Sequence, residues 1–288
     1  MSRRLYSIRG NDQRLDGGAM FGNAPKSLWE RWAPADSDNR IDLATRAMLV
    51  HEEGRFILFE AGIGAWQSPR MRERYGVQDS TNRLIHSLDL HGLTPSDIHV
   101  VVLSHLHFDH AGGLLSDWSE DAPPRLGFPN ATFLVSRRHW ERALSPHVRD
   151  QASFIPELNQ QLAESGRLAL VDDASHPLLG PGYRFHFSDG HTPGMMLTEL
   201  DGDHGPVVFG ADLVPGRAWV HTSISMGYDR FPELLLDEKR TLLASLAKRH
   251  GRLFYTHDPS TALSHITRDA QGRFGSANNK GSVRGVEI

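Results

Sequence analysis

Short apolar runs separated by turns predict β-strands in the first half of the chain. In residues 47–62 two apolar runs flank a Glu-Glu-Gly turn, which is typical of a β-hairpin, and the second run ends at an acidic residue and a glycine. Residues 80–91 place Leu84, Ile85 and Leu88 on one helical face, and a turn then leads to the apolar run 98–103. This pattern predicts a helix followed by a buried strand, and residues 130–135 predict another strand.

The second half of the chain repeats this style. Residues 183–187, 207–209 and 253–255 predict strands, and each is followed closely by a His or an Asp. Residues 137–166 are polar with a helical tendency, and we interpret them as an insertion or cap. Residues 232–250 predict one helix, with Pro232 in its first turn and Gly251 at its end. The tail after about residue 268 is rich in Gly, Ser and Asn and is either an ordered flap or frayed.

Composition narrows the class of protein. Of 288 residues, 39% are hydrophobic and 23% charged, and no apolar run approaches the roughly 18 residues that cross a bilayer. The sequence therefore predicts no membrane association and, since no secretory signal is present, a cytoplasmic location. Lys and Arg (31) and Asp and Glu (35) are interleaved, which disfavours nucleic acid as a partner. Because the chain has no cysteine, any metal must be held by His, Asp or Glu.

Histidine is unusually frequent, at 17 residues, and three of these residues lie in one short segment. Directly after the predicted strand 98–103, the sequence reads Ser-His-Leu-His-Phe-Asp-His-Ala-Gly-Gly over residues 104–113. His105 and His107, two residues apart, can converge on one metal ion. Asp109 and His110 can then turn toward a second ion, with the glycines allowing a tight turn behind them.

Four separated motifs in this order resemble those of the metallo-β-lactamase-fold hydrolase superfamily. They are HLHFDH at 105–110, GHTPG with His191, GAD with Asp212 and THD with His257. The resemblance implies one metal site at His105, His107 and His191, a second at Asp109, His110 and His257, and Asp212 as the bridging ligand. It also implies an α/β fold, a four-layer αββα sandwich, as a single domain over residues 1–288 with the helical insertion at about 137–166.

The resemblance further implies a cofactor and a mechanism. The cofactor would be two divalent transition-metal ions, with zinc as first choice and manganese, iron or cobalt as alternatives. A hydroxide bridging the two ions would attack a substrate carbonyl. Asp109 and Asp212 would orient this nucleophile.

Within the superfamily, the string SHLHFDHAGG is most similar to the lactonase branch, which includes N-acyl-homoserine lactonases. The expected function is therefore hydrolysis of a lactone or carboxylic ester with an apolar acyl or aryl group. A glyoxalase-II-like thioesterase is the main alternative. A phosphotriester or aryl-ester hydrolase and a non-catalytic metal-dependent ligand-binding protein remain as lesser ones.

The substrate pocket is less well specified by the sequence. The lactonases generally place a tyrosine three residues after the bridging Asp, but Pro215 occupies that position here, and Tyr228 is the candidate substitute. Met20 and Phe21, in the Gly-flanked segment 16–22, are candidates for a mobile lid, with core packing or a homodimer contact as the alternative. Trp66 and His221 complete the candidate pocket, and most other histidines, including His139, are assigned to surface or packing.

Overall fold

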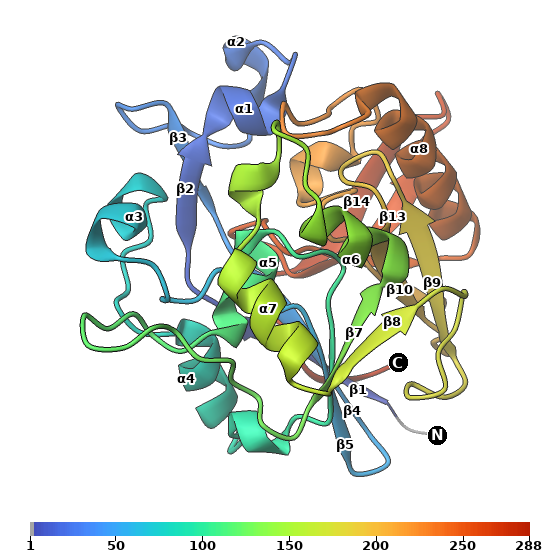
Figure 1. The fold of residues 1–288 in the computed structure, drawn as a ribbon. Coiled ribbons are helices and arrows are strands. Elements are labelled where there is room, and N and C mark those ends of the chain that lie inside the picture. Colours follow the sequence, from blue (N-terminus) through green and yellow to red (C-terminus); the bar gives the residue numbers. More distant parts are fainter. Residues whose placement is uncertain (1–2) are drawn as a thin grey trace.

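Two β-sheets form the centre of the molecule (Figure 1). The computed structural model describes residues 3–288, so Met1 and Ser2 of the expected domain lie outside the described residues. The first sheet has the strand order β15-β1-β4-β5-β6-β7-β8. Its strands are β1 (Arg4–Arg9), β4 (Arg46–Glu52), β5 (Arg55–Phe59), β6 (Val100–Val102), β7 (Thr132–Ser136), β8 (Leu168–Val171) and β15 (Arg284–Glu287).

The second sheet has the order β14-β13-β12-β11-β10-β9. Its strands are β9 (Tyr183–Ser188), β10 (Met195–Leu200), β11 (Val207–Phe209), β12 (Arg252–Phe254), β13 (Leu263–Arg268) and β14 (Phe274–Lys280). Both sheets are mixed, because β5 to β8 run parallel in the first and β11 runs parallel to β12 in the second. A separate two-stranded sheet joins β2 (Gln13–Asp16) to β3 (Arg40–Leu43).

Alternating side chains of the first sheet enter two different cores. Met48 and Val50 of β4 belong to the larger core, together with Phe209 of the second sheet. Ala47 and Leu49, on the other face of the same strand, belong to a second core. Because successive side chains of a strand point to opposite faces, both faces of the central strands are apolar and the sheet is covered on both sides.

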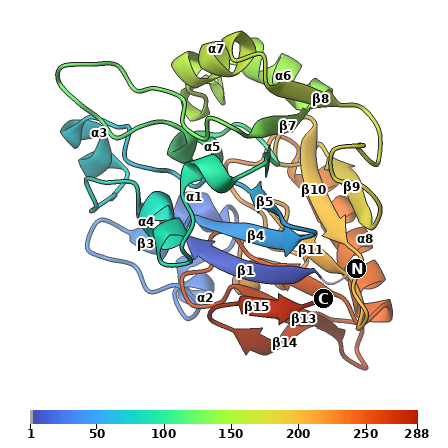
Figure 2. The same ribbon diagram turned by 90° about the horizontal axis from the view of Figure 1, so that it is seen from below.

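Helices cover the outer faces of the two sheets (Figures 1 and 2). Residues of α4, α6 and α7 fill the second core against the first sheet, and α8 packs on β13 and β14. The helices are α1 (Gly17–Phe21), α2 (Lys26–Trp29), α3 (Pro69–Arg74), α4 (Arg83–Asp89), α5 (Phe108–Ala111), α6 (Arg137–Leu144), α7 (Pro156–Glu164) and α8 (Pro232–Lys248). The expected αββα sandwich is thereby confirmed.

Most elements expected from the sequence are present. The hairpin at 47–62 is β4 and β5, and the expected helix 232–250 is α8. The polar stretch 137–166 forms α6 and α7, which connect the parallel strands β7 and β8. The tail is ordered: β14 extends the second sheet, whereas β15 pairs with β1 of the first. In the described residues 3–288, no helix is both long and apolar enough to cross a membrane.

Candidate metal centre

The seven candidate ligands lie on loops that follow strands of both sheets. His105 and His107 follow β6, and the short helix α5 carries Asp109 and His110. The other ligands come from the second sheet: His191 follows β9, Asp212 follows β11 and His257 follows β12. The fold therefore brings together all seven residues that the sequence analysis assigned to metal binding, and all seven are buried.

The first group consists of His105, His107 and His191. One nitrogen of each ring lies within 4.8 Å of the others, which is close enough for the three to bind one ion. His107 Nδ1 and His191 Nε2 are 3.3 Å apart.

The second group consists of Asp109, His110 and His257, with ligand atoms again within 4.8 Å of one another. His257 Nε2 lies 3.1 Å from His110 Nε2 and 3.4 Å from Asp109 Oδ2. These three residues come from α5 and from the loop after β12, so the second group, like the first, draws on both sheets.

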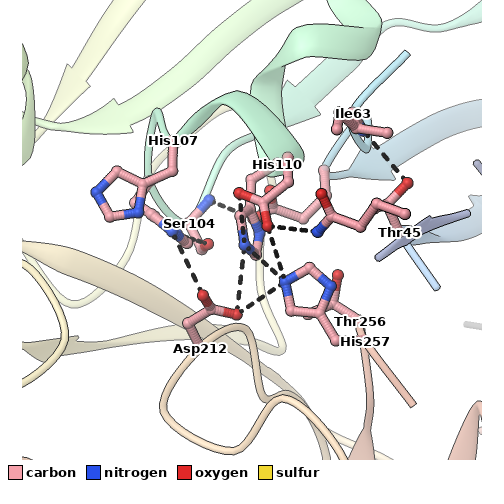
Figure 3. A network of polar contacts seen from close by, with 12 residues as sticks. Thr45, Ile63, Ser104, His107, His110, Asp212, Thr256 and His257 are labelled. Atoms are coloured by element: carbon pink, nitrogen blue, oxygen red, sulfur yellow. Dashed lines mark hydrogen bonds and ion pairs between the residues drawn. The ribbon is translucent and has the colours of Figure 1, made fainter. Parts of the chain in front are cut away.

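Asp212 lies between the two groups (Figure 3). Its Oδ1 is 3.3 Å from His110 Nε2 and 3.2 Å from His257 Nε2, both in the second group. Its Oδ2 is 3.3 Å from His191 Nε2 in the first group. The preceding residue, Ala211, has a φ of 40°, a sparsely populated conformation for a residue with a side chain. The two oxygens of Asp212 therefore face different ligand groups, as those of a bridging carboxylate do.

The donor atoms suit divalent transition metals. Burial lowers the pKa of His105 and His107 well below the ordinary value, and neighbouring histidines lower it further. Both rings are therefore neutral at pH 7 and offer a nitrogen lone pair. Burial opposes ionisation of Asp212, but the adjacent His110, His257 and His191 hold its pKa well below the usual range.

Two of these ligand atoms are buried without a well-aligned hydrogen bond, namely His105 Nε2 and Asp212 Oδ1, although Asp212 Oδ1 lies within 3.3 Å of two imidazole nitrogens. A buried polar atom without a partner is costly, and a metal ion would satisfy both. The residues present thus fit a pair of divalent ions.

Carboxylates and carbonyls behind the ligands fix the rings. His110 Nδ1 lies 3.2 Å from Glu60 Oε2, and Glu60 also accepts a hydrogen bond from the Ser104 amide. His191 Nδ1 lies 2.9 Å from Asp229 Oδ1. Such contacts orient an imidazole and set which nitrogen faces the metal.

The remaining ligands have partners of their own. His257 Nδ1 lies 2.7 Å from the carbonyl oxygen of Ala44, and Gln13 Nε2 donates to Asp109 Oδ2 at 2.8 Å. The sequence analysis missed Glu60, Asp229 and Gln13. For Glu60 alone there was a sequence signal, since it is the acidic residue that ends the hairpin.

His139, which the sequence analysis assigned to surface or packing, is buried between two ligand loops. Its Nε2 accepts a hydrogen bond from the Leu106 amide at 2.8 Å, and its Nδ1 lies 3.0 Å from the Pro193 carbonyl oxygen. Burial lowers the pKa of His139 to about 4, so the ring is neutral and can donate from one nitrogen while accepting at the other. It links the loop of His105 and His107 to the loop of His191.

A cavity of about 460 Å³ opens over the metal ligands. Met20 and Tyr228 line it together with His107, Asp109 and Asp212. Partial burial raises the pKa of Tyr228 to about 12, with a further contribution from Asp109, so its hydroxyl remains protonated at neutral pH.

The other candidate pocket residues lie elsewhere. Phe21 and His221 line a separate cavity of about 500 Å³, where Phe21 stacks between Trp29 and Trp219. Trp66 packs partly buried against the second core, with its ring close to Gly112. The segment 16–22 contains the short helix α1, which Asp16 caps by accepting a hydrogen bond from the Ala19 amide.

Comparison with known proteins places this site in context. The profile of the Metallo-beta-lactamase superfamily matches residues 40–257. An N-acyl homoserine lactonase of Bacillus thuringiensis is 27% identical over 179 residues, which is 62% of this chain and 62% of the relative's length. The N-acyl homoserine lactonase AttM of Azorhizobium caulinodans is 33% identical over 206 residues, covering 66% of this chain and 67% of that protein.

Solved structures match over nearly the whole chain. A probable metal-dependent hydrolase from Staphylococcus aureus has a TM-score of 0.86 at 25% identity, covering 99% of this chain and 98% of that one. The dizinc quorum-quenching lactonase AidC, solved in complex with a product, has a TM-score of 0.74 at 22% identity, covering 96% and 94%.

Proposed function

Because the chain belongs to the metallo-beta-lactamase superfamily, we propose that it is a di-metal hydrolase that opens a lactone or cleaves a carboxylic ester with an apolar acyl or aryl group. The observation that carries the proposal is the position of Asp212, whose two oxygens face two different groups of metal ligands. The named relatives are N-acyl homoserine lactonases, which favours lactones as the substrate class.

Two divalent ions held here, with zinc as first choice, would polarise the substrate carbonyl and lower the pKa of water to near neutrality. One ion would be held by His105, His107 and His191. The other ion would be held by Asp109, His110 and His257. Asp212 would contribute a ligand to both ions. Glu60 and Asp229 keep the rings of His110 and His191 in place.

Asp109 and Tyr228 are the residues we assign to the reacting groups. Asp109 is held by Gln13 and faces the cavity, where its carboxylate can accept a hydrogen bond from the attacking water and orient it. Tyr228 keeps its proton and can donate a hydrogen bond to a substrate oxygen. It comes from the loop before α8 and takes the role that Pro215 cannot supply.

The apolar part of the cavity fits the hydrophobic portion of a lactone or ester. Met20, Met226 and Phe108 line the same space as the ligands. Apolar walls around a few fixed polar groups are usual for a small-molecule site.

A substrate panel tests this proposal against the thioesterase alternative. The zinc-loaded protein is assayed with a series of lactones and aryl esters and, in parallel, with S-lactoylglutathione. We expect kcat/KM to be higher for a lactone or ester. A preference for S-lactoylglutathione of more than tenfold, about 1.4 kcal/mol of transition-state discrimination, would establish the thioesterase reading instead.

A further inference from the structure

Some charged side chains that line the cavity over the candidate metal ligands form no ion pair within the described part of the chain. Four arginines line the cavity: Arg14, Arg40, Arg74 and Arg149. Four aspartates line it as well: Asp16, Asp109, Asp150 and Asp212. The formal charges of these arginines and aspartates are therefore equal before any metal binds, but Asp109 and Asp212 are candidate metal ligands. Two divalent ions would more than neutralise these two carboxylates and leave the cavity positive.

Two of the arginines are paired with carboxylates. Arg14 Nε lies 2.6 Å from Asp42, and Arg40 Nε lies 3.0 Å from Asp36. Asp150 is likewise paired, since Arg142 Nη2 lies 2.7 Å from its Oδ2. These groups neutralise one another and have little charge left for a ligand.

Arg74 and Arg149 have no such partner. Among the described residues 3–288, no ion pair is formed between a carboxylate and the guanidinium group of Arg74 or of Arg149. Arg74 ends α3 and lies over the ring of Tyr75, at 6.0 Å from its centroid. Arg149 donates a hydrogen bond to the Gly227 carbonyl at 3.0 Å, which holds it beside Tyr228. Both guanidinium groups keep unused donors.

Asp16 supplies one negative charge against the two arginines, but none of its hydrogen-bond donors among the described residues is a guanidinium. Its Oδ1 accepts from the Ala19 amide at the start of α1, and its Oδ2 accepts from Asn39 Nδ2 at 2.8 Å. The carboxylate of Asp16 thus caps the N-terminus of α1 and binds the side chain of Asn39, which precedes β3.

We infer that the substrate carries a carboxylate, separate from the ester or lactone group, which Arg74 and Arg149 bind. This rests on the proposed function and specifies its substrate class. Guanidinium groups form charge-assisted and often bidentate hydrogen bonds with carboxylates, and these are stronger than bonds between neutral groups. The rest of the substrate lies against Met20, Met226 and Tyr75. The substrate is an anionic lactone or ester with an apolar body.

Binding to the metal-loaded protein tests the anion site without turnover. Butyrate and glutarate each offer one carboxylate to the metals, and only glutarate offers a second. Isothermal titration calorimetry should show glutarate binding at least about tenfold more tightly, because its second carboxylate can form charge-assisted hydrogen bonds with the two guanidinium groups. The difference should shrink when NaCl is raised from about 0.05 to 0.5 M, since salt screens exposed charges.

Kinetics with two lactones provides the second arm. γ-Butyrolactone is compared with the same ring bearing a carboxylate on its γ-carbon, 5-oxotetrahydrofuran-2-carboxylate. We expect wild type to prefer the charged lactone, and Arg74→Met and Arg149→Met each to lower the ratio of the two kcat/KM values several-fold. Arg70→Met is the matched control, because Arg70 lies on the same helix α3 but does not line the cavity, and it should keep the wild-type ratio.

The outcomes separate this inference from the proposed function. Equal handling of the two lactones, or an unchanged ratio in both arginine variants, would overturn the inference while leaving lactone hydrolysis established. A different result is that neither lactone is hydrolysed, yet glutarate binds more tightly than butyrate to wild type and loses this advantage in Arg74→Met and Arg149→Met. This result would support the anion site and show that the proposed reaction is wrong.

Discussion

At the scale of single residues, Asp212 has the largest expected effect on the site. Its two oxygens face different groups of histidines at 3.2 to 3.3 Å. No other carboxylate among the described residues contacts His191, His110 and His257 together. Loss of this side chain removes a ligand from both groups at once.

Asp212→Ala is therefore expected to lose one or both metals and nearly all hydrolytic activity. Metal content per chain and kcat/KM are measured on the same preparation. Asp203→Ala, at an exposed aspartate in the turn before β11, is the control and should match wild type. Unchanged metal content and rate in Asp212→Ala would remove Asp212 from the site.

Tyr228→Phe is expected to keep both metals and to lower kcat by about 100-fold, the lower end of the loss that follows removal of a hydrogen-bond donor to a developing oxyanion. Since the pKa of Tyr228 is raised to about 12, the wild-type pH profile should show no alkaline limb from this group below about pH 10. Tyr6→Phe, at a tyrosine outside the cavity, is the control. Wild-type kinetics for Tyr228→Phe would assign the tyrosine to packing.

The sequence was informative for the candidate ligands because each stands directly after a strand, within a short motif. For the residues that orient the ligands, the only local signal was Glu60, the acidic residue at the end of the predicted hairpin, and nothing indicated which ligand it contacts. Glu60 is 50 residues from His110 and Asp229 is 38 residues from His191 in the chain, so these contacts arise only when separate elements pack. A carboxylate at a strand end has many other uses, and its partner cannot be inferred from local pattern.

At the scale of elements, α8 buries a lysine among apolar residues. Lys239 is fully buried and donates hydrogen bonds to the carbonyl oxygens of His221 and Ile224, in the loop that leads to Tyr228. No carboxylate in residues 3–288 lies within ion-pair distance of it. Burial lowers the pKa of Lys239 from 10.5 to about 8.

This shift predicts a rise in stability with pH. Between about pH 8 and 10.5 the unfolded chain still binds the proton that folded Lys239 has lost, so the free energy of unfolding increases with pH. The gain should approach about 3 kcal/mol, and it should be absent from Lys239→Met. Urea denaturation of both proteins across this range, at equal metal content, measures the difference. Parallel curves for the two proteins would contradict the shift.

The N-terminal segment 16–22 shows why some elements could not be assigned from the sequence. Its glycines and apolar residues fit a mobile lid as well as a packed segment. The structure forms α1 there and buries Phe21 between Trp29 and Trp219, the latter 198 positions further along the chain. Strands and long helices were predictable from local periodicity, whereas this packing depends on a distant aromatic ring.

At the scale of the whole molecule, the two groups of candidate metal ligands connect the two sheets. Each of them takes ligands from the loop after β6 in the first sheet and from loops of the second. Ions bound at these positions would cross-link the two halves of the sandwich and stabilise the folded state over the unfolded chain.

Removal of the metals should therefore lower the melting temperature. Binding at 1,000 times Kd contributes about 4 kcal/mol, which for a chain of this size corresponds to roughly 5 to 15 °C. Differential scanning calorimetry before and after chelation, and after zinc is restored, measures this shift. Asp212→Ala should show a smaller one. Identical melting temperatures with and without metal would mean that the groups do not bind ions in the folded protein.

The most direct test of the di-metal hydrolase is the metal content per chain, determined by elemental analysis of protein purified without chelator or added metal. Hydrolysis of the lactone and ester panel is measured on the same sample. We predict about two transition-metal ions per chain, as expected for two groups sharing one carboxylate, together with turnover. One ion or none, with no activity after addition of zinc, manganese or cobalt, would contradict the bridging role of Asp212 and the proposed reaction.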